Sequence, residues 1–139
     1  MFPSEYKIEA INEMGKGSMI EHLGIEFTEI STQYITAKMP VDHRTMQPFG
    51  FLHGGASVAM AESLGSFASV IMLDISKEYP AGLEINANHL KSVKSGFVYG
   101  RVEPIHIGKG THVWDIKIKN EADQLVCISR LTVAILKNR

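Results

Sequence analysis

The sequence predicts an α+β fold in which one long helix is wrapped by an antiparallel sheet of about six strands. Residues Phe49–Leu73 are small or apolar almost throughout and include one charged side chain, which is typical of a helix that other elements cover. Most of the remaining chain consists of strand-like runs separated by short turns, and such turns join antiparallel neighbours. No repeat or linker divides the 139 residues, so we expect a single domain, residues 1–139.

The first half of the chain predicts a short helix, a hairpin and the long helix. The expected ranges are Glu5–Met14 for the short amphipathic helix, Leu23–Thr28 and Gln33–Val41 for the hairpin, and Gly54 to about Leu73 for the long helix. Gly15 and Gly17 end the short helix. The loop before the long helix contains Pro48 and Gly50, which interrupt regular structure.

The second half predicts a polar connector, Ser76–Pro80, followed by four strands. The expected strands are Ala81–Val93, Phe97–Ile107, Thr111–Lys119 and Gln124–Leu136, with turns at Lys94–Gly96, Gly108–Gly110 and Asn120–Asp123. The third of these strands alternates most clearly, with Trp114, Ile116 and Ile118 on one face and polar residues at most positions of the other. That alternation indicates a sheet with one face in the core.

The composition excludes several classes of function. A formal net charge of −1 provides no general attraction to nucleic acid or to anionic membranes. Cys127 is the one cysteine, so there is no disulfide framework, and we interpret it as a core residue. Neither Cys127 nor the remaining histidines have metal-ligand spacing, so no metal is expected. These histidines are His22, His43, His106 and His112. The N-terminal residues lack the apolar segment of a secretory signal, and we expect a cytoplasmic protein.

The apolar stretch Phe49–Leu73 is long enough to raise the question of a membrane span. A central glutamate, several glycines and the amphipathic strands elsewhere argue against that interpretation. We therefore expect a core helix and no membrane partner.

Glu62 is the charged residue within this stretch, and it is the strongest indication of function. Burial of a carboxylate without a partner costs several kcal/mol, and perturbed carboxylates cluster at functional sites. The alternative is a structural acid that pairs with a distant arginine or lysine. Ser66 lies one turn later on the same helix face, where it could orient the carboxylate or a water, or could simply be a small residue that permits close packing.

His53, Gly54 and Gly55 stand where the loop turns into the helix. The first N–H groups of a helix lack intrahelical partners and lie at its positive end, and glycine lets a ligand approach them. The alternative is that the glycines only permit a tight entry into the helix. Gly54 and Glu62 are about 12 Å apart along the helix axis, so their cooperation requires two copies of the helix that lie antiparallel across a two-fold axis.

Residues 39–66, which include MPVDHRTMQPFGFLHGGASVAMAES, together with the later GLEINANHLKSVKSG, resemble the hotdog-fold acyl-CoA thioesterases. Within this PaaI-like superfamily the sequence is most similar to the bacterial branch that acts on aromatic acyl-CoA, such as 1,4-dihydroxy-2-naphthoyl-CoA in menaquinone biosynthesis. It is also similar to the relatives that clear misacylated aryl carrier proteins. The similarity extends from about Leu23 to Leu136. It implies the hotdog fold, in which a six-stranded antiparallel sheet wraps a long central helix.

The resemblance also implies roles for individual residues. Glu62 would be the catalytic carboxylate, acting as a general base or as a nucleophile. The Gly54 N–H would polarise the thioester carbonyl, with Gln47 as a second donor. His53 would hold the thioester or the leaving thiol, and Ser66 would position water.

A basic segment near the end of the expected strand Ala81–Val93 is the candidate for binding the phosphates of CoA. Its residues are His89, Lys91, Lys94, Ser95 and Gly96. Relatives often have arginine at the two lysine positions, and lysine lacks the bidentate fork, so we expect looser nucleotide binding. The alternative for either lysine is a solvated turn charge.

Three classes of function compete. The first is a thioesterase that releases free acid and CoA, with no cofactor beyond the thioester substrate. The second is a hotdog 3-hydroxyacyl dehydratase, which the short spacing from His53 to Glu62 disfavours. The third is a non-catalytic acyl-CoA-binding module. We expect a homo-oligomer, which by resemblance is a dimer of dimers. The expected substrate is an acyl-CoA or an acyl carrier protein. The residues do not distinguish CoA from a carrier protein as the thiol, or an aryl from an alkyl group as the acyl part.

Overall fold

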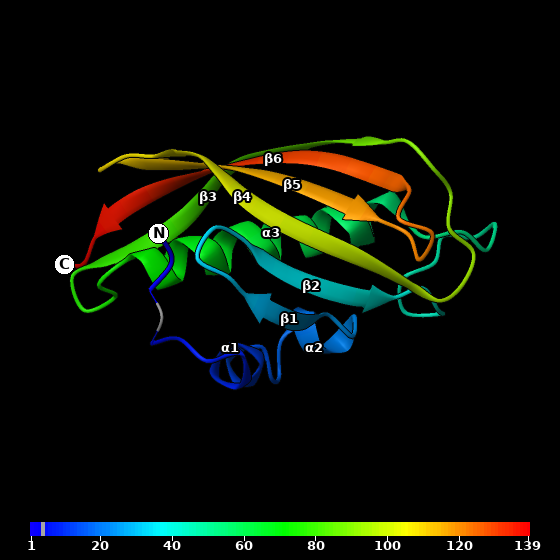
Figure 1. Ribbon diagram of the computed structural model, residues 1–139, viewed down its shortest axis with the longest axis horizontal. Coiled ribbons are helices and arrows are strands. Elements are labelled where there is room, and N and C mark those ends of the chain that lie inside the picture. Colours follow the sequence, from blue (N-terminus) through cyan, green and yellow to red (C-terminus); the bar gives the residue numbers. More distant parts are fainter. Residues whose placement is uncertain (4) are drawn as a thin grey trace.

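The computed structural model describes residues 1–3 and 5–139, and a six-stranded antiparallel sheet wraps its longest helix (Figure 1). The elements are α1 (Ile8–Met14), α2 (Met19–His22), β1 (Glu26–Ile30), β2 (Ile35–Pro40), α3 (Gly54–Met72), β3 (Glu78–His89), β4 (Phe97–Ile107), β5 (Thr111–Lys119) and β6 (Leu125–Lys137). This confirms the predicted α+β architecture with a central helix.

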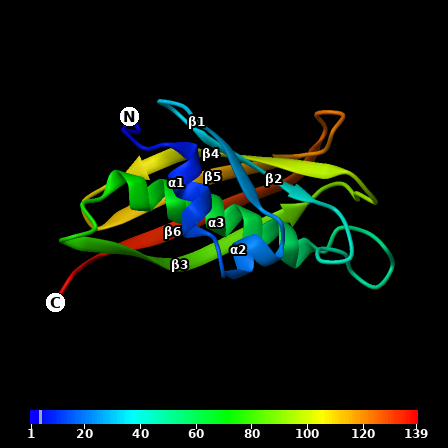
Figure 2. The same cartoon turned by 90° about the horizontal axis from the view of Figure 1, so that it is seen from below.

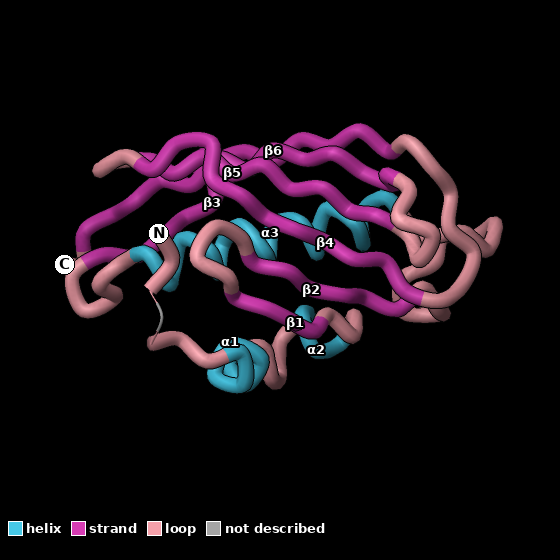
Figure 3. Tube along the Cα trace, in the orientation of Figure 1, coloured by secondary structure: helices cyan, strands magenta, loops and turns pink. Residues whose placement is uncertain are grey.

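The strand order is β1-β2-β4-β5-β6-β3, which leaves β1 and β3 at the two edges of the sheet. Viewed from below, α1 and α2 lie on the side of the molecule away from β5 and β6 (Figure 2). The loops gather at the two ends of the long axis, and the loop that leads into α3 lies at the end opposite the C-terminus (Figure 3). Both ends of α3 are therefore close to loops, while its middle lies beneath the sheet.

The core forms where α3 packs on the inner face of the sheet. The expected alternation in β5 is confirmed, because Trp114, Ile116 and Ile118 are all buried. Small residues set the distance between the layers. A Cβ added to Gly65 would lie 2.5 Å from Leu131 Cδ2, so a side chain there would push the helix off β6.

A polar cluster is buried in this core. The Trp114 Nε1–H donates to Ser69 Oγ at 2.8 Å, and the same oxygen lies 3.0 Å from His112 Nδ1. Phe2 stacks on Trp114 with ring centroids 5.8 Å apart. Burial lowers the pKa of His112, which favours the neutral imidazole.

Several expected boundaries are wrong. β3 begins at Glu78 rather than Ala81, because residues 78–80 already pair with β6, and it ends at His89 rather than Val93. The first helix begins at Ile8, not Glu5. The short helix α2 has no counterpart in the sequence analysis; the Ser18 side chain caps it by accepting from the Ile20 N–H at 3.2 Å.

By length and composition alone, α3 could cross a membrane. This is weak evidence, because a helix at the centre of a protein core meets the same criteria. Here α3 packs against β2 to β6, and its Phe67 contacts Phe27 of β1 with ring centroids 4.9 Å apart, which is the environment of a core helix.

Candidate active site

The start of α3 is organised by His53. Its Nδ1 accepts from the Gly55 N–H at 2.8 Å, so the imidazole is the N-cap of the helix and its second nitrogen stays available. Within the described part of the chain the Gly54 N–H has no hydrogen-bond partner. That N–H therefore lies at the positive end of α3 as a free donor.

An open cavity of about 320 Å³ lies beside this helix start, and we call it the helix-start cavity. Its lining residues are Gln47, Phe51, Leu52, Gly54, Ser57, His89, Leu90, Lys91, Ser92 and Val126. His89 crosses directly over Gly54: a Cβ added to Gly54 would lie 2.7 Å from His89 Nε2. Glycine at this position leaves room for the imidazole of His89 over the start of the helix.

Gln47 enters this cavity from a tight turn. Its backbone carbonyl accepts from the Gly50 N–H at 3.0 Å, and its side-chain Oε1 accepts from the Phe49 N–H. Gly50 has a φ of 85°, which favours glycine. Because the side-chain oxygen is used in the turn, the NH₂ group is the part of Gln47 that can donate to a ligand.

A second cavity of about 320 Å³ opens further along α3, and we call it the mid-helix cavity. Its lining residues are Met19, Ile20, Ala59, Glu62, Ser63, Ser66 and Phe67. The predicted burial of Glu62 is wrong for the protomer, because its side chain is exposed. The reason is that β3 is an edge strand, so no strand of the described sheet covers the helix face beyond it.

The surroundings of Glu62 support a role beyond structure. Among the described residues, no lysine, arginine or histidine lies within ion-pair distance of its carboxylate. A Cβ on Gly82 in β3 would lie 2.8 Å from Glu62 Oε1, so the carboxylate rests against the backbone of the sheet edge. The alternative of a structural acid paired with a distant cation therefore has no support within the chain.

The two serines of this cavity differ. The Ser63 hydroxyl donates to the Ala59 carbonyl at 2.7 Å, within its own helix. For the Ser66 hydroxyl, the described residues offer no hydrogen bond, and it shares the cavity with Glu62 without bonding to it. Ser66 is therefore free to bind a water or a ligand.

The basic segment divides between two places. His89 and Lys91 line the helix-start cavity. Lys94 and Ser95 instead line a neighbouring hollow of about 330 Å³, and the Lys94 Nζ lies 5.2 Å from the centre of the Phe51 ring.

The sequence analysis missed two residues at these sites. Ser57 is 1% exposed and lines the helix-start cavity; its position one helical turn after Gly54 was a usable signal. Glu121 lines the hollow beside Lys94 and accepts from the Phe97 N–H at 2.8 Å. No local signal indicates that contact, because the two residues are 24 positions apart.

Metal chemistry has no support in the described residues: across 1–3 and 5–139, no group of three His, Cys, Asp or Glu side chains could hold an ion. The candidate chemistry instead consists of hydrogen-bond donors and cations in one cavity and a carboxylate with hydroxyls in the other.

Comparison with known proteins gives consistent matches. The family model described as Thioesterase superfamily matches residues 49–127. The chain is 50% identical over 129 residues to the 1,4-dihydroxy-2-naphthoyl-CoA hydrolase of Escherichia coli (strain K12), covering 93% of this chain and 94% of that enzyme. It is 43% identical over 129 residues to the proofreading thioesterase EntH of Cronobacter turicensis, covering 93% of each chain.

A solved structure is also similar throughout. The crystal structure of a mutant thioesterase from Pseudomonas aeruginosa superposes with a TM-score of 0.97 at 46% identity, covering 99% of each chain. The matched residues include both cavities of α3.

Proposed function

Because this chain belongs to the thioesterase superfamily and is a thioester hydrolase, we propose that it hydrolyses acyl-CoA thioesters with aromatic acyl groups at a site shared by two subunits. The observation that supports this proposal is the division of the chemistry along α3. The free Gly54 N–H and the Gln47 amide line one cavity, and Glu62 lines another that shares no residue with it. Along the helix axis the two positions are about 12 Å apart.

Two antiparallel copies of α3 bring the two halves together. In such a dimer each Gly54 lies near Glu62 of the partner subunit, which produces two equivalent sites. The exposed face around Glu62 and the unpaired edge of β3 support this arrangement. Tyr79 and Leu83, on β3, are 45% and 63% exposed, and a second copy would cover such apolar surface. A dimer of dimers is the assembly that we propose from the family resemblance.

In the proposed reaction, the thioester carbonyl oxygen accepts from the Gly54 N–H and from the Gln47 amide. Negative charge that develops on this oxygen is stabilised by about 3–4 kcal/mol per donor. Glu62 of the partner subunit either removes a proton from the attacking water or attacks the carbonyl itself to form an anhydride that water then hydrolyses. Ser66 beside that carboxylate holds the water. Overall, one water cleaves the C–S bond and yields the free acid and the thiol.

The remaining residues would bind the leaving group. His53 uses Nδ1 for the cap, so its Nε2 side is available to the thiol. His89 and Lys91 stand at the rim, where they would meet the phosphates of CoA. The reaction requires no cofactor beyond the thioester, and we place it in the cytoplasm.

The aromatic preference rests on the relatives. The Escherichia coli relative is named as a hydrolase of 1,4-dihydroxy-2-naphthoyl-CoA, an aromatic ester, and EntH is named as a proofreading thioesterase. A related role for this chain would be in menaquinone biosynthesis or in the clearance of an acylated carrier protein.

The test is the release of free thiol from a panel of aryl- and alkyl-CoA esters, with wild type beside Glu62→Gln. We expect aryl esters to be hydrolysed fastest and the variant to lose about a hundredfold or more in kcat, because the amide keeps the shape but lacks the basic and nucleophilic carboxylate. An unchanged rate in the variant would remove Glu62 from the mechanism. Faster hydrolysis of alkyl esters would overturn the aromatic preference.

A further inference from the structure

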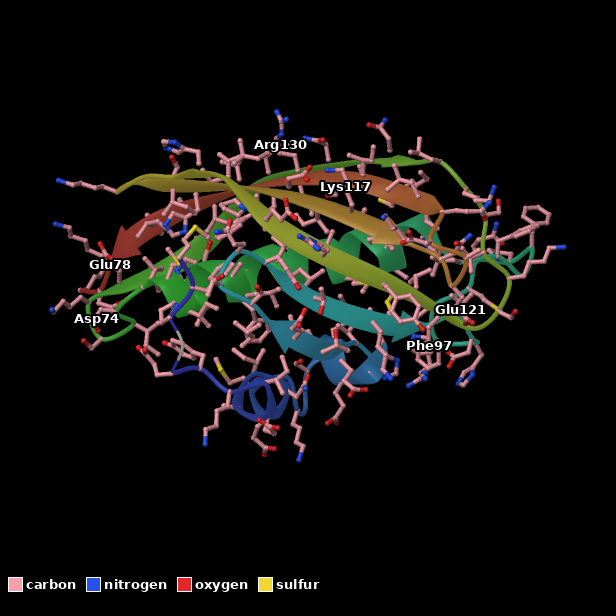
Figure 4. The ribbon with its side chains drawn as sticks, viewed as in Figure 1. Asp74, Glu78, Phe97, Lys117, Glu121 and Arg130 are labelled. Atoms are coloured by element: carbon pink, nitrogen blue, oxygen red, sulfur yellow. The ribbon has the colours of Figure 1, made fainter. Side chains whose placement is uncertain are left out.

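The hollow beside the helix-start cavity contains an acid next to residues that the sequence analysis expected to meet the phosphates of CoA. The turn between β3 and β4 carries Lys94 and Ser95, which were expected to meet the phosphates of CoA. Glu121, from the turn between β5 and β6, lines the same hollow. Figure 4 shows Glu121 and Phe97 close together at the end of the sheet.

The Glu121 side chain binds the backbone of this turn directly. Its Oε1 accepts from the Phe97 N–H at 2.8 Å. The preceding residue, Gly96, has a φ of 77°, and a Cβ added to it would collide with the same carboxylate oxygen. A backbone N–H in such a turn can bind phosphate, but here the Glu121 carboxylate already accepts from it.

The turn that carries Glu121 is well ordered by its own hydrogen bonds. Asn120 Oδ1 accepts from the Ala122 N–H at 3.0 Å and from the Gln124 N–H at 2.9 Å. Asp123 adopts a φ of 61° and pairs with Lys119 at 3.2 Å. Because these contacts do not involve the Glu121 side chain, the hairpin holds its shape without it.

The charge of Glu121 is not neutralised locally. Within the described residues, no cation lies at ion-pair distance from its carboxylate. A phosphate group that approached Lys94 would meet this negative charge and would compete with it for the Phe97 N–H.

We infer that Glu121 is a specificity-determining residue that weakens binding of the nucleotide end of CoA. The inference rests on the proposed function, since it concerns the thiol carrier of the same substrate. At the turn around Gly96, where the resemblance implies binding of the CoA phosphates, Glu121 limits the affinity for a phosphate-bearing group. The pantetheine arm carries no charge at the thioester end, so its binding is not affected.

The test is calorimetric titration of CoA, and separately of adenosine 3′,5′-bisphosphate, into wild type, Glu121→Gln and Asp123→Asn. Gln keeps the oxygen that accepts from Phe97 but removes the charge. We expect both ligands to bind Glu121→Gln about three- to fivefold more tightly, with a smaller gain at high salt. Asp123→Asn is the control, because it removes one negative charge from the same turn at a residue that pairs with Lys119 and does not line the hollow, and Asn tolerates a positive φ. It should leave both affinities unchanged.

Kinetics provide a second readout. In Glu121→Gln the KM for a CoA ester should fall while kcat and the KM for the matching pantetheine ester stay constant. Glu121→Ala is the second variant and should show the same gain, since the hairpin keeps the Asn120 hydrogen bonds. Equal or weaker CoA binding in both variants would overturn the inference, as would an equal gain in Asp123→Asn.

The two proposals fail in different ways. If the wild type hydrolyses an ester but substitution of Glu121 leaves the CoA affinity unchanged, the inference is wrong and the proposed function stands. Absence of turnover on every ester overturns the proposed function, whatever the variants bind.

Discussion

The helix-start cavity and the mid-helix cavity have the same volume, about 320 Å³, but they differ in chemistry. The first lies at the positive end of α3 and combines the free Gly54 N–H with the Gln47 amide and Lys91. The second contains the Glu62 carboxylate and the free Ser66 hydroxyl. One cavity suits an oxygen that becomes negative, and the other suits the group that attacks.

A straight helix separates the two groups that the proposed reaction combines. A rise of about 1.5 Å per residue keeps Gly54 and Glu62 apart in every copy of the chain. Each protomer is therefore expected to be inactive by itself and to complete its site with the opposite cavity of a second copy.

The largest effect is expected when each cavity is disabled in a different subunit. Glu62→Ala removes the carboxylate, and Gly54→Pro removes the N–H at a helix position where proline is tolerated, although the ring of His89 must move. Each homodimer should lose about a hundredfold or more in kcat. Equal mixing of refolded subunits should restore about a quarter of the wild-type rate, because half of the dimers are mixed and each has one intact site.

Size-exclusion chromatography of the mixture, with the two variants tagged differently, establishes that mixed dimers form. Mixed dimers without activity would contradict the shared site.

A smaller effect is expected for the second donor in the helix-start cavity. Gln47→Ala should lower kcat about a hundredfold, the low end of the range for one donor, because one hydrogen bond to the developing oxyanion is lost. Gln33→Ala is the control, since Gln33 is an exposed glutamine outside both cavities. Thermal unfolding of both variants separates this effect from loss of the turn contact with Phe49. A kcat for Gln47→Ala equal to that of the control would exclude this donor.

The mid-helix cavity offers an internal comparison of two hydroxyls. Ser66→Ala should lower kcat about three- to tenfold, because a hydroxyl that binds the attacking water is lost. Ser63→Ala should have little effect, because its hydroxyl is bonded to the Ala59 carbonyl. Steady-state kinetics on one CoA ester decide between them. Equal rates in both variants would mean that Ser66 is only a small packing residue.

The smallest effect is expected at the rim. Lys91→Ala should raise the KM for a CoA ester about twofold to fivefold and leave kcat unchanged, because an exposed charge pair contributes little. The effect should weaken with salt and should vanish for a pantetheine ester. Lys109→Ala, an exposed lysine in the turn between β4 and β5, is the control. A change in kcat would place Lys91 closer to the chemistry than we propose.

Strong local signals in the sequence predicted much of the fold. The bounds of β4 and β5 are correct, because each strand lies between glycine-containing or polar turns. The start of β3 was missed, since Glu78 and Pro80 are typical of a turn and only pairing with β6 makes them a strand. The family resemblance is confirmed by the matches to known thioesterases.

The candidate site was predicted less completely. The sequence indicated Glu62 and the helix start, but it predicted burial where the protomer exposes the acid. Composition cannot distinguish a helix face that the chain itself covers from a face left open beside an edge strand. The Glu121 contact was missed because it depends on the register of β4 and β5: Tyr99 pairs with Lys119, which places Phe97 opposite Glu121 just beyond the ladder. The catalytic roles of Glu62, Gly54, Gln47, His53 and Ser66 stay predictions.

Trp114 gives the protein a built-in optical probe. It is the one tryptophan of the chain, and it is buried, hydrogen-bonded to Ser69 and stacked on Phe2. Its emission therefore reports one place in the core, and Trp114 lines neither cavity. Substitutions in the cavities should leave the emission spectrum unchanged as long as the core is intact, so folding and thiol release can be followed in the same cuvette.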